Sequence, residues 1–236
     1  MLAVGRPNPH RLAARDHNPK PLSFPDNPLD AMASLAVTSS WRRGEEVYRQ
    51  DDLAEHWYRV LSGMVRKCAM QPDGRRQIVD FFVPGDFFGL CAGNRHYFCA
   101  ESVTNGTVIA RYPRRQLETL ADSDRRVARC IRELTLEAIA RLQARMLVLG
   151  RMTAAEKVGL FLIEMAERSQ NDNVDYIVLP MSRSDIADYL ALSVETVCRA
   201  LTDLKQSGTI RLAGSHHVMI VDHVALAARI RKGMGA

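Results

Sequence analysis

The most restrictive feature of the sequence is one long stretch of helical periodicity near its middle. From Asp122 to Leu149 the chain contains neither glycine nor proline, and apolar residues recur at steps of three or four positions. A helix of about 26 residues is roughly 39 Å long, at about 1.5 Å per residue. A helix of this length extends beyond a small domain, so we expect it to join two folded units.

One face of this predicted helix is apolar and the opposite face is charged. The apolar stripe can lie on the core of its own domain, or it can pack against a second copy of the chain. We favour a dimer seam, because the length of the helix leaves part of the stripe uncovered. The predicted seam residues are Ile131, Leu134, Ala138, Leu142, Met146 and Leu149.

We place this helix at residues 122–150. The composition and the hydrophobic pattern of the sequence differ on its two sides. Residues 1–34 hold many prolines and predict a flexible extension, with a short helix near Pro28–Leu35. Residues 35–121 alternate strand-forming runs with turn residues, which is typical of an antiparallel sandwich or barrel. Residues 151–236 mix helices and strands. The predicted fold class is therefore α+β, with two domains joined by the long helix.

Composition excludes several classes of protein. The chain has 236 residues, of which 47% are hydrophobic and 25% charged, as in ordinary globular proteins. It has no run of 18 apolar residues and no apolar segment at its N-terminus, so we predict neither a membrane span nor a secretory signal, and a cytoplasmic location. The net charge of +5 permits a nucleic-acid partner without requiring one.

The sequence also argues against an enzyme and against a metal centre. It contains no G-x-S-x-G, P-loop or H-E-x-x-H motif. Its five cysteines show no C-x-x-C spacing, so neither a disulfide framework nor a zinc site is predicted.

Residues 182–207 predict a helix-turn-helix. Ser182 and Asp185 are typical of a capped helix start, Ala191-Leu192 forms a tight turn, and Ser193 caps the second helix. A strand, turn and strand follow over residues 210–221, as in the wing of a winged helix. In such folds the second helix enters the major groove of DNA with its N-terminal end first.

The outward face of this second helix carries side chains able to read bases. Arg199 can donate two hydrogen bonds to guanine, and Glu195 can accept one from cytosine. The alternative is an ordinary exposed ion pair between the two residues. The predicted base-reading residues are Val194, Glu195, Cys198 and Arg199. The predicted phosphate-binding residues are Ser182, Arg183, Ser193 and Thr196.

Four segments carry a resemblance to a known family: GEEVYRQDD, YRVLSGMVRK, PGDFFGL and SRSDIADYLALSVETVCRAL. Over about residues 36–225 the chain resembles the CRP/FNR superfamily of bacterial transcription regulators. The resemblance implies a β-roll of the cyclic-nucleotide-binding type (a jelly roll), a dimerisation helix and a winged helix-turn-helix. It also implies a homodimer that binds double-stranded DNA at a palindrome and recruits RNA polymerase.

The recognition helix resembles that of the fumarate-and-nitrate regulator branch, whose pattern is V-E-T-x-S-R. This chain has the run from Val194 to Arg199, with Cys198 in place of the serine. The resemblance implies a TTGAT-type inverted repeat in which Glu195 and Arg199 read the G·C pair, while Val194 packs on a thymine methyl group.

Departures from the family argue against its cofactors. Where the cyclic-nucleotide subfamily has a glutamate and an arginine, this chain has Gly89-Leu90 and Phe98-Cys99. No cysteine precedes Cys68, so the iron–sulfur site of the oxygen-sensing branch is absent. We therefore expect no cofactor, and a FixK-type activator of microaerobic, nitrogen-fixation or respiratory genes. The alternative is a sensor of the same superfamily that depends on a ligand or on haem.

Two groups of cysteines leave alternatives open. Cys198 can be a small isosteric contact to DNA, or a redox switch on an exposed helix face near Arg199. Cys91, His96 and Cys99 can ligate haem or a metal, although cysteines inside a β-roll more often act as small apolar residues.

Overall fold

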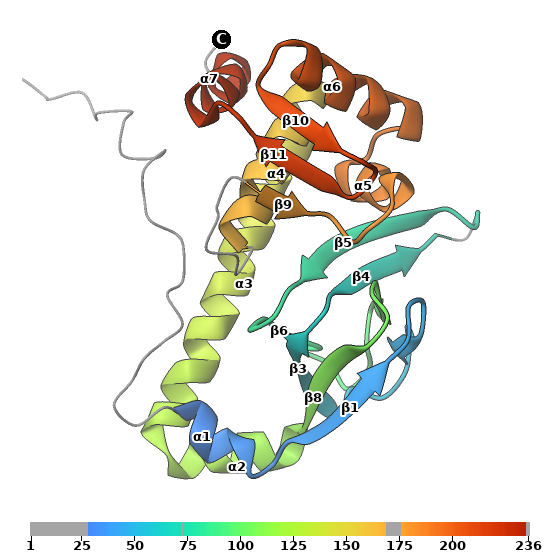
Figure 1. Cartoon of the computed structure of the whole chain (residues 1–236). Coiled ribbons are helices and arrows are strands. Elements are labelled where there is room, and N and C mark those ends of the chain that lie inside the picture. The colour runs from blue at the N-terminus through green and yellow to red at the C-terminus, as the bar shows by residue number, and fades with distance from the viewer. Residues whose placement is uncertain (1–27, 72, 169–175, 235–236) are drawn as a thin grey trace, which may run out of the picture.

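The structure, a computed structural model, describes residues 28–71, 73–168 and 176–234 (Figure 1). A β-rich domain and a smaller mixed domain lie beside one long helix, which confirms the predicted α+β class. Most of the predicted extension, residues 1–34, lies outside the described residues. Its last part forms α1 (Pro28–Ala33), the predicted short helix, and the Met32 side chain is fully buried.

The N-terminal domain is a β-roll of two four-stranded antiparallel sheets. The strand orders are β1-β8-β3-β6 and β2-β7-β4-β5. The strands are β1 (Val37–Trp41), β2 (Glu46–Tyr48), β3 (His56–Ser62), β4 (Val65–Met70), β5 (Arg76–Phe82), β6 (Phe87–Phe88), β7 (Cys99–Ser102) and β8 (Thr107–Pro113).

Aromatic side chains fill the space between the two sheets. Phe88 stacks on Tyr58 and Phe82, with ring centroids 5.2 and 5.1 Å apart, and the ring of Tyr48 lies 3.7 Å from that of His96. Alternate residues of a strand point to the same face, so the sequence alternation directs these rings inward. The β-roll is therefore a packed core.

Strands β4 and β5 form an antiparallel hairpin. The two strands pair from Val65 with Phe82 to Met70 with Arg76. The turn contains Gly74 at a φ of 83°, a left-handed conformation that glycine adopts without strain. The hairpin extends toward the C-terminal domain (Figure 1).

The long helix is α3 (Arg125–Arg151), and Asp124 caps its start by accepting a 2.8 Å hydrogen bond from the backbone N–H of Arg126. A separate helix before it, α2 (Arg114–Ser123), was not predicted. The segment directly follows β8, and its apolar face, with Leu117 buried and Leu120 packed beside it, is only ten residues long.

The C-terminal domain packs helices around a three-stranded sheet of order β10-β11-β9. Thr153 and Glu156 form a capping box at the start of α4, with the Thr153 N–H donating to the Glu156 carboxylate at 2.8 Å. The elements follow in the order α4 (Ala154–Arg168), β9 (Tyr176–Val178), α5 (Arg183–Leu190), α6 (Val194–Gln206), β10 (Ile210–Ala213), β11 (His217–Ile220) and α7 (His223–Met234). The predicted helix-turn-helix is α5 and α6, and the predicted wing is β10 and β11.

The two domains share a hydrophobic contact. Phe81 of β5 is fully buried, and its ring lies 5.1 Å from that of Tyr189 in α5 and 6.5 Å from that of Phe161 in α4. The β4–β5 hairpin therefore lies directly against the first helix of the helix-turn-helix.

Candidate DNA interface

The helix-turn-helix begins with a closed capping box on α5. Ser182 Oγ accepts from the Asp185 backbone N–H at 3.0 Å, and the Asp185 carboxylate accepts from the Ser182 N–H at 3.0 Å. Two N–H groups that lack partners within the helix are thereby satisfied. The start of α5 is fixed by its own sequence.

A tight turn sets the angle between α5 and α6. Ala191 adopts a left-handed conformation, with φ 51° and ψ 51°, and ends α5. Ser193 then caps α6, its hydroxyl accepting from the Thr196 N–H at 3.2 Å. A left-handed alanine is strained, and the turn is tolerated because the helices on both sides are well packed.

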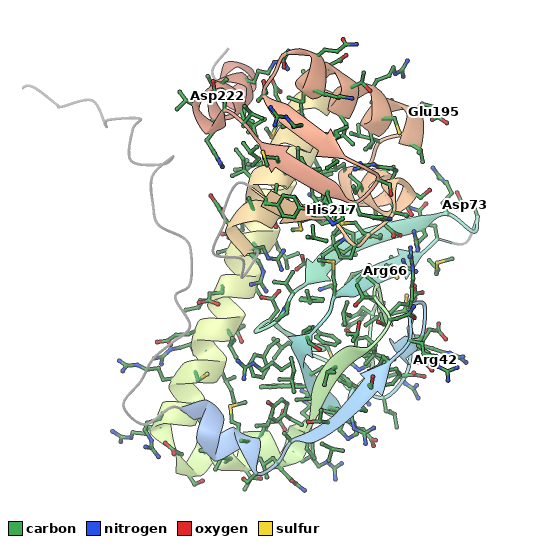
Figure 2. The ribbon with its side chains drawn as sticks, in the orientation of Figure 1. Arg42, Arg66, Asp73, Glu195, His217 and Asp222 are labelled. Atoms are coloured by element: carbon green, nitrogen blue, oxygen red, sulfur yellow. The ribbon has the colours of Figure 1, made fainter. Side chains whose placement is uncertain are left out.

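Helix α6 has one buried face and one exposed face. The residues buried in the domain core are Val197, Ala200, Leu201 and Leu204, whose spacing of three or four positions places them on one face. All four predicted base-reading residues, Val194, Glu195, Cys198 and Arg199, are exposed. Figure 2 shows Glu195 near the outer end of α6, directed away from the rest of the chain.

The charges at this end of α6 are available to a ligand. The backbone N–H of Glu195 and the Ser193 hydroxyl hold the pKa of the Glu195 carboxyl below its usual value, and Arg199 lowers it further. The Arg199 guanidinium donates to Thr196 Oγ1 at 3.4 Å. Within the described residues no ion pair joins Arg199 to Glu195, so the two side chains can act separately.

The four predicted phosphate-binding residues differ in exposure. Ser193 is exposed and Thr196 is half-buried, and both lie in the cap of α6. Ser182 is half-buried and its hydroxyl serves the cap of α5. Arg183 is half-buried with Nη1 unpartnered; burial lowers the pKa of its guanidinium, and the nearby Cys198 raises it.

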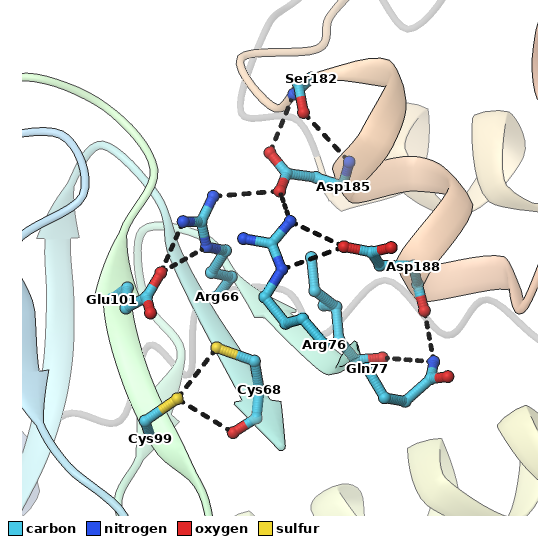
Figure 3. Close-up of polar contacts among 10 residues, drawn as sticks. Arg66, Cys68, Arg76, Gln77, Cys99, Glu101, Ser182, Asp185 and Asp188 are labelled. Atoms are coloured by element: carbon cyan, nitrogen blue, oxygen red, sulfur yellow. Dashed lines mark hydrogen bonds and ion pairs between the residues drawn. The ribbon is translucent and has the colours of Figure 1, made fainter. Parts of the chain in front are cut away.

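A charged contact, not predicted from the sequence, ties α5 to the β-roll (Figure 3). Asp185 Oδ1 receives Arg66 of β4 at 3.0 Å and Arg76 of β5 at 2.5 Å. Arg76 also donates to Asp188 at 2.7 Å, and Arg66 donates to Glu101 at 2.5 Å. We name these five residues the clasp. Its contacts to α5 join residues more than 100 positions apart, so no local pattern reveals them.

Burial and the neighbouring donors shift the pKa of the Asp185 carboxyl in opposite directions. The side chain is 3% exposed, and burial raises the pKa of its carboxyl. The hydrogen bonds from Ser182 and the guanidinium groups of Arg66 and Arg76 lower this pKa by more, so the net shift is downward. The carboxylate that caps α5 is therefore also the acceptor that holds the β-roll against it.

Helix α3 exposes the second half of the predicted seam, Leu142, Met146 and Leu149, and covers part of the first half. Ile131 and Leu134 pack against the cluster around Leu117 and Val127, and Ala138 is half-buried. Their placement fits the alternative in which part of the helix lies on its own domain. The exposed apolar residues of α3 are Leu136, Ile139, Leu142, Met146, Leu147 and Leu149.

The interior of the β-roll does not fit a cyclic nucleotide. Among the described residues of this domain, the buried polar side chains are His96, Ser102 and Thr107, and none of them is an arginine. The aromatic cluster occupies the space between the sheets. Cys91 is half-buried, with its thiol 3.3 Å from the carbonyl oxygen of Gly93, and it does not join His96 and Cys99 in a ligand cluster.

No helix within the described part of the chain is long and apolar enough to cross a membrane.

Comparisons with known proteins agree with this geometry. Residues 38–124 match a family model described as a cyclic nucleotide-binding domain, and residues 156–229 match a Crp-like helix-turn-helix domain. The chain is similar to the nitrogen fixation regulation protein FixK of Azorhizobium caulinodans, at 42% identity over 84% of this chain and 81% of the relative. It is also similar to the protein of that name in Rhizobium meliloti, at 35% identity over 96% and 98% of the two chains.

Among solved structures, FixK2 from Bradyrhizobium japonicum matches with a TM-score of 0.78 and 39% identity, over 82% of this chain and 96% of that one. The relatives from Azorhizobium caulinodans and Rhizobium meliloti are both named as nitrogen fixation regulation proteins. The exposed end of α6 and the Crp-like helix-turn-helix together make this a DNA-binding protein. The chain belongs to the CRP/FNR family of transcription regulators, in its FixK branch.

Proposed function

We propose that the protein is a homodimeric activator that binds a TTGAT-type inverted repeat with α6 of each subunit. The exposed end of α6 carries this proposal, because Glu195 and Arg199 are exposed and not paired with each other. Arg199 can reach guanine O6 and N7, Glu195 can accept from cytosine, and the exposed Val194 can pack on a thymine methyl group. In this proposal the DNA phosphates beside these bases are bound by Ser193, Thr196, Ser182 and Arg183.

The proposed dimer brings two such helices to one duplex. The exposed apolar residues of α3 support it, since apolar area of this extent on a helix favours a partner. A two-fold axis along α3 relates the two half-sites, which accounts for an inverted repeat. The relatives' names support a role in the regulation of nitrogen fixation. In this proposal the bound dimer recruits RNA polymerase at nitrogen-fixation, microaerobic or respiratory genes.

A selection of bound duplexes from a random pool tests the proposed site. We expect the purified protein, without any additive, to enrich inverted repeats with TTGAT half-sites. Enrichment of an unrelated sequence, or of single half-sites, contradicts the proposal. Specific binding that appears only after addition of a nucleotide or haem favours the ligand-dependent sensor instead.

We further propose that oxidation of Cys198 weakens DNA binding. The thiol is exposed on the base-reading face, and the guanidinium of Arg183 lies close enough to interact with it. A sulfinate there adds negative charge opposite phosphate. Peroxide is expected to lower the operator affinity of the wild type and to leave Cys198→Ser unchanged, as measured by fluorescence anisotropy. An equal loss of operator affinity in both proteins contradicts this proposal.

A further inference from the structure

Two cysteines that the proposed function does not use lie side by side in the β-roll (Figure 3). Cys68 of β4 and Cys99 of β7 are directly opposite each other in an antiparallel pair. Their sulfur atoms are 3.1 Å apart, and Cys99 Sγ donates to the Cys68 carbonyl oxygen at 3.1 Å. Both residues are buried, at 0% and 6% exposure.

The backbone already has the spacing that a disulfide needs. Residues directly opposite in antiparallel strands have Cα atoms about 4.5–5.5 Å apart. Disulfides join Cα atoms about 4.4–6.8 Å apart, with a bond of about 2.05 Å. The sulfur atoms of Cys68 and Cys99 therefore need to approach by only about 1 Å, which side-chain rotation can supply.

The two thiols differ in acidity. The hydrogen bond between them raises the pKa of Cys68, which is also desolvated, and lowers the pKa of Cys99. Cys99 therefore ionises first, and its thiolate has a protonated partner within reach. A nucleophile next to a second thiol is the arrangement found at reversible thiol oxidation sites.

We propose that Cys68 and Cys99 are a redox-active dithiol that a hydroperoxide oxidises to an intramolecular disulfide. The Cys99 thiolate attacks a peroxide oxygen and the O–O bond breaks, which leaves a sulfenic acid and, after protonation, water. The Cys68 sulfur then attacks the sulfenic sulfur, its proton leaves with the hydroxyl group as a second water, and the S–S bond forms. Two thiols lose two electrons and two protons, and one hydrogen peroxide becomes two waters.

The pairing of Glu101 with Arg66 favours thiol oxidation over metal binding at this site. Glu101 lies near both thiols, and the ligand atoms of the three residues are within 4.8 Å of one another. Glu101 Oε2, however, receives Arg66 Nη2 at 2.5 Å and Nε at 2.8 Å. A guanidinium held this close, with its side chain only 14% exposed, opposes the approach of a cation.

The disulfide would lie under the contact between the two domains. Arg66 and Glu101 are also direct partners, two positions further along the same two strands. Residues two apart in a strand share a face, so the thiols and the Arg66 end of the clasp are neighbours. The cross-link also closes a loop from residue 68 to residue 99, which restricts the unfolded chain.

Peptide mapping of the Cys198→Ser variant tests the proposal, because this variant lacks the exposed thiol. After hydrogen peroxide treatment and trypsin cleavage, we expect residues 68–75 linked to residues 96–111, two mass units below the sum of the free peptides. Dithiothreitol should separate them. The oxidised protein should also unfold several degrees higher, and this shift should disappear on reduction.

Controls separate this site from the other thiols. Cys130→Ser and Cys91→Ser should leave the linked peptide unchanged, and Cys99→Ala should abolish it. If Cys99→Ala does not fold, mapping of the Cys198→Ser protein alone decides. Free thiols at both positions after peroxide treatment, or a link from Cys99 to Cys91, overturn the proposal. The test does not involve DNA, so its outcome is independent of the proposed operator.

Discussion

At the scale of single residues, the outer end of α6 holds side chains with different freedom to meet a partner. Glu195 stays ionised, because the cap at Ser193 and its own N–H stabilise the carboxylate. Arg199 makes one weak contact, at 3.4 Å to Thr196, and it can leave that contact at little cost. Recognition by these residues therefore requires no refolding of the helix.

Arg199→Ala should lower affinity for the TTGAT repeat by about 1–3 kcal/mol and relax the preference at the guanine, because a two-bond contact is lost. Lys205→Ala, in the exposed last turn of the same helix, is the matched control and should leave the preference intact. Anisotropy with duplexes altered at single positions measures both. An unchanged guanine preference in Arg199→Ala contradicts the assigned register of α6.

Features of this site that depend on local sequence patterns are predictable. The caps at Ser182 and Ser193, the turn at Ala191 and the exposed face of α6 all follow from residues a few positions apart. The partners of Asp185 do not, since Arg66 and Arg76 come from another domain. The pairing of Cys68 with Cys99 likewise depends on strand register, which the sequence pattern leaves open.

At the scale of elements, helix α5 contacts both the core of its own domain and the β-roll. Its apolar side closes the core of the helix-turn-helix, and its acidic residues hold the β4–β5 hairpin through the clasp. Polar groups stabilise such a contact only while all partners are present, because a buried carboxylate without a partner lowers the stability of the folded protein. The orientation of the DNA-binding domain thus depends on side chains of the β-roll.

Arg76→Ala should destabilise the protein by about 1–3 kcal/mol, because Asp185 and Asp188 lose a hydrogen-bonding partner. Arg75→Ala is the control, since the neighbouring Arg75 is 77% exposed and pairs only with Asp73 among the described residues. Urea unfolding of the two variants measures the difference. Equal midpoints for both variants show that the clasp contributes nothing to stability.

Stability should also depend on pH through Asp185. Its pKa is lower in the folded protein, so its contribution is present above the unfolded value of about 3.9 and is lost as pH falls through the folded value. We expect the free energy of unfolding to fall more steeply below about pH 4 in the wild type than in Asp185→Asn. Urea titrations from pH 6 to pH 3 test this, and parallel curves exclude the effect.

At the scale of the whole molecule, α3 is divided into two parts. Its first turns pack on the β-roll through Val127, Ile131 and Leu134, which anchors the helix to its own subunit. Further along, Ile139 and Met146 are 45% and 73% exposed. The helix was predictable from its length and spacing. The exposed stripe was predicted only in part, because which side is covered depends on α1 and α2, and α2 was not predicted.

Ile139→Glu combined with Met146→Glu should convert the proposed dimer to a monomer, because two charges then face each other across the seam. Light scattering measures the mass, and affinity for the full inverted repeat should fall with it. Ala144→Glu, exposed on another side of α3, is the control and should leave the mass unchanged. Leu134→Glu is expected to unfold the β-roll instead, since Leu134 packs on its core. A wild-type monomer at micromolar concentration contradicts the proposed assembly.

The exposed stripe on α3 has a consequence for how the protein responds to its own abundance. If two copies must meet before either half-site is held firmly, the number of competent molecules rises with the square of the amount synthesised at low expression. Halving production then removes about three quarters of them. Target promoters would switch over a narrow range of expression, with no additional signalling molecule required.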